Sequence, residues 1–197
     1  MRNFLNGLLS GVVVLTILIV PQAINAQTPW SVEIRGGTHY ATQELGDADL
    51  SLGLGAEAML SYSFMPNFGA FVGWGWGQFS ADQSFAGEDM DFDETGYSFG
   101  LQYMNSCPRL NLNYIIRAGG IYNHLEVENN KGDIVDDSQH GLGWQAGAGV
   151  KIPFVNNWTI VPSLRYRSLS RELEDGNDKI DVDLTYISAG VGFSLAF

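Results

Sequence analysis

Apolar and small polar residues alternate along most of this chain with a period of two. Between residues 185 and 197, Thr, Ile, Ala, Val, Phe, Leu and Phe occupy every second position, with Tyr, Ser, Gly, Gly, Ser and Ala between them. A period of two is typical of a β-strand with two different faces. The pattern recurs along the chain and predicts eight strands, at residues 30–40, 52–64, 68–77, 95–104, 112–123, 141–152, 158–167 and 183–197.

The two faces of these strands differ in a way that identifies their surroundings. One face carries large apolar side chains, such as Leu52, Leu54 and Leu60, and the other carries mainly glycine and serine with a few charges. A soluble barrel packs its large apolar side chains inside, whereas a membrane barrel turns them outward to the lipid. Each segment has about 10 residues or more, the length of a tilted membrane strand. The sequence therefore predicts an all-β, eight-stranded, antiparallel up-and-down transmembrane β-barrel, in which the last strand closes against the first.

The connections between these segments alternate in length. Short links rich in proline and asparagine lie at 65–67, 105–111 and 153–157, whereas long polar links lie at 43–50, 80–94, 126–140 and 168–183. Membrane barrels have short periplasmic turns and long extracellular loops. Aromatic residues of the apolar face gather near both ends of the segments, as expected at two membrane interfaces. We therefore expect short periplasmic turns and long acidic extracellular loops.

The N-terminus has the three parts of a secretory signal peptide. A basic start with Arg2 precedes an apolar run over residues 8–20, and the small residue Ala26 follows as a cleavage site. The apolar run is too short to cross a bilayer comfortably as a helix. We expect residues 1–26 to form a cleaved signal peptide and residues 27–197 to form one outer-membrane barrel domain.

The formal net charge of −12 comes mainly from carboxylates in the predicted long loops. Such a surface repels nucleic-acid phosphates, so nucleic acid is excluded as a partner. Carboxylates are ligands for Ca²⁺ and Mg²⁺, and the densest cluster offers Asp89, Asp91, Asp93 and Glu94. This cluster lacks the Gly at the sixth and the Glu at the twelfth position of an EF-hand loop. It is interpreted either as a solvated loop or as a divalent-cation site.

Several charged residues fall on the face that points into the barrel. They are Glu33, Arg35, Glu57, Arg117, Lys151, Arg165 and Arg167. Buried charges must pair or find water, and eight strands leave an interior that side chains can fill. We expect a polar network that plugs the lumen, and the alternative is a narrow ion-conducting pore. The only cysteine, Cys107, has no partner for an intramolecular disulfide.

The segments 114–119 and 141–150 and the terminal Phe197 resemble the small eight-stranded outer-membrane barrels of the OmpA-like and OmpX-like type. The resemblance implies a monomer in the outer membrane of a Gram-negative bacterium, in contact with lipid and lipopolysaccharide. It also implies that Phe197 is a signal read by the outer-membrane assembly machinery.

Some similar barrels are enzymes that modify lipid A. Their deacylases carry a His-x-Ser pair, but none of His39, His124 and His140 is followed by serine at that spacing. Their palmitoyl transferases begin with an amphipathic helix, for which residues 27–29 leave no room. A rim triad of His124 or His140 with Ser138 stays an alternative on spacing alone. We expect a non-enzymatic protein without a cofactor, which acts in envelope integrity or binds cations or other ligands at the cell surface through its acidic loops.

Overall fold

A computed structural model describes residues 29–197, except 47, 85–86, 111, 130 and 176–177. The predicted signal peptide therefore lies outside the described residues. Strand formation follows the alternating pattern, and a short 3-10 turn, η1 (Pro108–Leu110), joins two of the strands. The strands are β1 (Trp30–Ala41), β2 (Gly53–Ser63), β3 (Phe68–Ser84), β4 (Gly87–Cys107), β5 (Leu112–Glu128), β6 (Ile134–Asp137), β7 (Gly141–Val155), β8 (Trp158–Asp175) and β9 (Asp178–Ala196).

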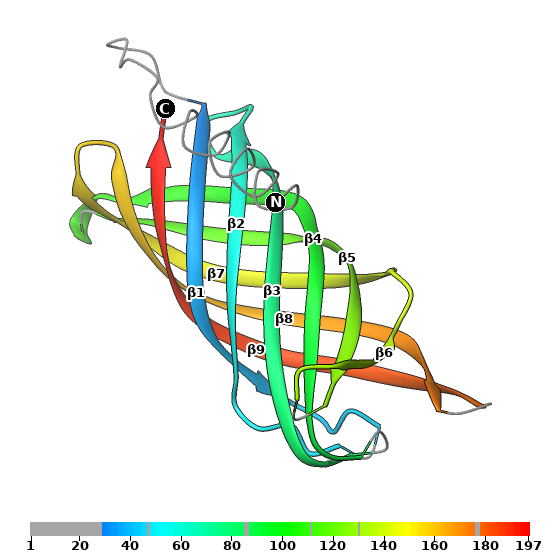
Figure 1. Ribbon diagram of the computed structural model, residues 1–197. Coiled ribbons are helices and arrows are strands. Elements are labelled where there is room, and N and C mark those ends of the chain that lie inside the picture. Colours follow the sequence, from blue (N-terminus) through cyan, green and yellow to red (C-terminus); the bar gives the residue numbers. More distant parts are fainter. Residues whose placement is uncertain (1–28, 47, 85–86, 111, 130, 176–177) are drawn as a thin grey trace, which may run out of the picture.

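Hydrogen bonds join eight of these strands into a closed ring. The order is β1–β2–β3–β4–β5–β7–β8–β9, β9 pairs with β1, and every neighbouring pair is antiparallel (Figure 1). The short β6 adds to β5 at the long-loop end. At the other end, the backbone N–H of Phe197 donates to the carbonyl oxygen of Trp30 over 3.0 Å. The predicted eight-stranded up-and-down barrel is confirmed.

The outward face of the barrel is apolar along most of its height. Leu54, Val72 and Leu142 expose 62%, 57% and 71% of their surface, while the inward Glu57 and Arg165 expose only 6% and 5%. An outward apolar face and a polar interior are the arrangement that lipid requires. Among the described residues, no helix is long and apolar enough to cross a membrane.

Two segments expected as long loops are instead mostly strand. β3 and β4 continue through 80–94 as a hairpin, and β8 and β9 do the same through 168–183. The alternation persists in both hairpins, but the apolar residues now point inward and the polar residues outward. In the first hairpin, Phe79 and Phe92 point inward and are fully buried, while Ser80 is exposed. Apolar-in and polar-out is the pattern of a sheet in water. The barrel wall therefore continues beyond the lipid-facing zone.

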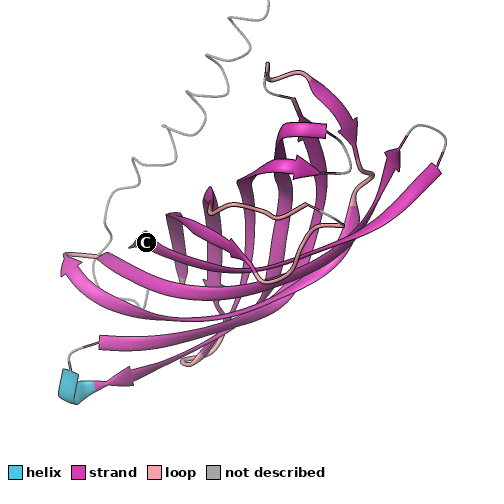
Figure 2. Ribbon diagram, turned by 90° about the horizontal axis from the view of Figure 1, so that it is seen from below, coloured by secondary structure: helices cyan, strands magenta, loops and turns pink. Residues whose placement is uncertain are grey.

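The interior of this extended end is an apolar core. Its members are buried to at least 95% and come from several strands and from the β1–β2 loop: Leu45, Ala48, Phe79, Ala81, Met90, Phe92, Ile121, Leu125, Val127, Leu169, Val182, Leu184 and Tyr186. The loop residues Leu45 and Ala48 exchange two backbone hydrogen bonds of 3.0 Å, which satisfy their buried polar groups. Figure 2 shows the strands curving around this common interior. We call this cluster the apolar plug.

Candidate functional site

An ion pair between β1 and β5 crosses the lumen, since these strands lie on opposite sides of the ring. Arg117 donates from both terminal nitrogens to Glu33, over 3.0 Å and 2.7 Å, and its Nε donates to Gln102 over 3.3 Å. The two charged side chains expose 8% and 4% of their surface. This bidentate geometry is the strongest form of an arginine–carboxylate contact.

A second carboxylate, Glu57 of β2, is surrounded by donors. Arg165 and Arg167 of β8 both form ion pairs with it, the latter at 3.3 Å, and the Ser98 hydroxyl donates to it over 3.0 Å. Arg35 of β1 reaches toward the β8–β9 side, where its Nη1 donates to the Ser188 hydroxyl over 2.9 Å. Together with the Glu33–Arg117 pair, buried charges from β1, β2, β5 and β8 thereby form one polar layer in the interior.

Six of the seven charges expected in the lumen are tied to a described partner. The exception is Lys151, which is half-buried and makes no ion pair with the described residues.

The sequence predicts that Glu94 belongs to the acidic loop cluster, but in the structure its side chain points into the lumen. It exposes 3% of its surface, forms an ion pair with Arg167 at 3.2 Å and accepts a 2.5 Å hydrogen bond from the Tyr186 hydroxyl. Its neighbour Asp93 faces the other side of β4, where it accepts from the Trp76 indole over 2.8 Å. Adjacent residues of a strand point to opposite faces. Asp93 and Glu94 therefore cannot share one cation site.

The other members of that cluster lie outside the lumen. Asp91 is half-exposed and accepts a 2.5 Å hydrogen bond from the Ser80 hydroxyl, while the side chain of Asp89 lies outside the description. Nearby, partial desolvation and the carboxylates of Asp93 and Glu126 raise the pKa of Glu128 above its usual range. The described carboxylates of this part of the rim therefore repel one another.

Arg171 is a further interior residue that sequence reasoning missed, because it was assigned to a long loop. It exposes 4% of its surface and donates to the backbone carbonyls of Asn123 over 3.0 Å and Gly141 over 2.6 Å. Continuing the alternation of residues 158–167 to Leu169 and Arg171 would have placed it inside.

Two small cavities lie between these groups in the described part of the lumen. One cavity is lined by Arg35, His39, Glu57 and Arg167, another by Arg117 and Arg165, and each has a volume of about 10 Å³. This is the space of about one water molecule.

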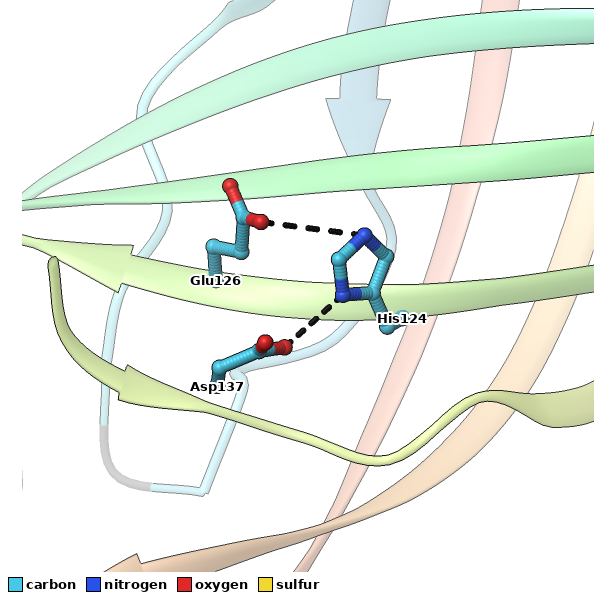
Figure 3. Close-up of side chains that lie close together, drawn as sticks. All are labelled: His124, Glu126 and Asp137. Atoms are coloured by element: carbon cyan, nitrogen blue, oxygen red, sulfur yellow. Dashed lines mark hydrogen bonds and ion pairs between the residues drawn. The ribbon is translucent and has the colours of Figure 1, made fainter.

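A histidine–carboxylate cluster lies on the outer wall at the long-loop end (Figure 3). His124 Nδ1 is 2.8 Å from Asp137 Oδ1, and His124 Nε2 is 3.7 Å from Glu126 Oε1. The ring of His140 stacks on that of His124 with centroids 4.3 Å apart. The described hydrogen bonds of Ser138 Oγ go to backbone atoms, from Leu125 N over 2.8 Å and to Gln139 O over 3.4 Å. Serine and histidine are thus not paired as a catalytic triad requires.

The protein-family model described as "Outer membrane protein beta-barrel domain" matches residues 10–197 of the chain. The chain belongs to this family. The family places this barrel in the outer membrane, in agreement with its apolar outer face. A comparison with curated proteins found no match.

Solved outer-membrane barrels share the fold at low sequence identity. Neisserial surface protein A is 13% identical with a TM-score of 0.65, and the match covers 88% of this chain and all of that one. OprG from Pseudomonas aeruginosa is 13% identical with a TM-score of 0.57, over 89% of this chain and 100% of OprG. The outer membrane protein AlkL is 17% identical with a TM-score of 0.54, over 91% of this chain and 95% of AlkL. At these identities the likeness concerns the fold alone.

Proposed function

We propose that this outer-membrane barrel is a non-enzymatic protein of a Gram-negative bacterium with a closed lumen, and that it acts at the cell surface through its acidic rim. The observation that supports the proposal is that two sets of buried side chains project into the interior from several strands. The Glu33–Arg117 pair and the Glu57 cluster occupy the polar layer, and the apolar plug occupies the long-loop end.

An ion that crosses this interior would have to pass both layers. In the polar layer it must separate buried ion pairs, and leaving a buried charge without its partner costs about 3–5 kcal/mol. In the apolar plug it would lose its hydration without gaining polar ligands. A closed lumen is therefore favoured over a conducting pore.

The accessible polar surface is then the rim at the long-loop end. The outward carboxylates of Asp91, Glu126, Glu128 and Asp137 attract cations. Divalent cations held there can bridge to the phosphates of lipopolysaccharide, which supports a role in envelope integrity or in binding surface ligands. We take the barrel to be a monomer that contacts lipid and lipopolysaccharide and presents Phe197 to the assembly machinery.

Planar-bilayer recording tests the closed lumen. The purified barrel is expected to give no stepwise conductance, and an Arg117→Ala/Arg165→Ala variant is the comparison, because it removes two charges from the polar layer but leaves the apolar plug. Stable unitary currents from the wild-type barrel would refute the closed lumen.

A mass spectrum of lipid A from cells with and without the overexpressed protein tests the non-enzymatic assignment. An unchanged acylation pattern is expected, because Ser138 is bonded to the backbone rather than to a histidine. The gain or loss of an acyl chain would establish the lipid A-modifying enzyme instead.

A further inference from the structure

The register of β5 and β6 gathers three potential metal ligands on the outer wall. His124 and Glu126 are two residues apart on β5 and face outward, whereas Leu125 between them is fully buried. Asp137 of β6 is the direct partner of Glu126, so its side chain lies on the same face. One oxygen or nitrogen from each of the three residues lies within 4.8 Å of the others.

The hydrogen bond to Asp137 determines which nitrogen of His124 is free. An ionised carboxylate only accepts hydrogen bonds, so in a neutral ring the proton lies on Nδ1, which is 2.8 Å from Asp137 Oδ1. Nε2 then presents a lone pair toward Glu126 Oε1, 3.7 Å away (Figure 3). Two lone pairs face each other across a gap longer than a hydrogen bond.

This gap has the dimensions of a metal site. Zinc binds histidine nitrogen and carboxylate oxygen at about 2.0–2.2 Å, which places two tetrahedral ligands about 3.4 Å apart. The observed 3.7 Å needs only a small side-chain adjustment. The three side chains expose 14%, 25% and 51% of their surface, in the order His124, Glu126, Asp137, so an ion can enter from solvent.

The strand register also places several carboxylates opposite one another near this cluster, where a bound cation would offset their repulsion. Glu126 lies between Asp93 of β4 and Asp137 of β6, and Asp91 lies opposite Glu128. Like charges directly opposite each other destabilise a sheet, and none of these carboxylates has an ion pair with a described lysine or arginine. Asp93 exposes 7% of its surface, and its Oδ1 has no hydrogen-bond partner among the described residues.

We propose that His124 Nε2 and Glu126 bind a divalent first-row transition metal ion such as Zn²⁺ at this rim. Asp137 holds the imidazole through Nδ1–H, the second-shell arrangement common to histidine metal ligands. The stacked ring of His140 limits rotation of His124, and water fills the remaining positions. An imidazole ligand selects Zn²⁺, Cu²⁺ or Ni²⁺ over the oxygen-seeking Ca²⁺ and Mg²⁺.

Competition of the folded barrel with a chromophoric chelator for Zn²⁺ measures the site directly. One Zn²⁺ per barrel is expected, His124→Ala should abolish its binding, and Asp137→Asn should weaken it about 10–100-fold. The matched control is Glu128→Gln, which removes the same charge from the same face of β5 and should change the affinity less than about threefold. Circular dichroism and heat-dependent gel mobility verify that each variant is folded.

Three results would refute the proposed metal site. They are the absence of Zn²⁺ binding at neutral pH, equal binding by wild type and His124→Ala, and displacement of Zn²⁺ by a modest excess of Ca²⁺. The last result would identify an unselective acidic rim. Conductance is measured separately, so failure of the metal site leaves the closed-lumen proposal testable, and the reverse also holds.

Discussion

Removing Arg117 should destabilise the barrel strongly, because it leaves a carboxylate buried without its cation. Arg117 supplies both described hydrogen bonds of Glu33, which exposes only 4% of its side chain. Breaking a buried ion pair from one side costs about 3–5 kcal/mol. We expect Arg117→Met to lose about that much free energy of unfolding, although the methionine conserves most of the side-chain length.

The double variant separates the charge effect from the packing effect. Replacing a buried pair by apolar residues is often nearly neutral, so Glu33→Leu/Arg117→Met should be more stable than the sum of the single losses predicts. Urea unfolding in lipid vesicles, followed by tryptophan fluorescence and extrapolated linearly, gives the four free energies of the cycle. A coupling energy of at least about 2 kcal/mol is expected for residues in one network.

A small effect would refute the reasoning. If Arg117→Met stays within about 1 kcal/mol of wild type, or the coupling is below about 0.5 kcal/mol, Glu33 must be satisfied by another group. Lys151 is one described candidate, because its charge, like that of Arg165, acts on Glu33, and Lys151 has no ion pair of its own among the described residues. Adding Lys151→Met to Arg117→Met would then produce the missing loss.

Two further predictions concern the apolar plug and the seam between β1 and β9. Phe79→Ala empties a fully buried position and should lower the free energy of unfolding in urea by about 3–5 kcal/mol. The same truncation at the lipid-facing Phe99, which is 44% exposed, should lower it less. Equal losses of stability in the two variants would contradict the apolar plug. A Cβ on Gly37 would overlap the backbone of Ala189 and lie 2.7 Å from Gly190 Cα, whereas a Cβ on Gly36 meets nothing closer than 4.0 Å. Gly37→Ala should therefore reduce the yield of folded, heat-modifiable barrel, whereas Gly36→Ala should not. A normal yield from both variants would mean that β1 and β9 can move apart at the seam.

The fold was accessible from sequence because one physical signal repeats in every strand. Outward residues such as Leu54 and inward residues such as Glu57 differ so sharply that a shift by one position would put charges into lipid. The predicted network residues follow from the same alternation. Their pairing does not, because sequence alone cannot say that Glu33 meets Arg117 across the ring.

The sequence reading failed where the solvent outside the barrel changes. The charges in 80–94 and 168–183 end the lipid-type pattern and predict loops there, although the alternation continues with apolar residues such as Phe92 and Val182 turned inward. The same error placed Glu94 and Arg171 outside. The cluster at His124 was also out of reach, since it depends on the pairing of Glu126 with Asp137 in β6.

The seam between β1 and β9 has a kinetic consequence. Its contacts join the two ends of the domain, as in the hydrogen bond from Arg35 to Ser188 across 153 residues. Such long loops close at a high entropic cost, and topologies rich in distant pairings fold slowly. Until the seam forms, β1 and β9 are unpaired edges open to other chains. The yield of refolded barrel should thus depend on the rate of closure relative to the rate of aggregation. Dilution of the protein should raise this yield more than any stabilising mutation elsewhere in the ring.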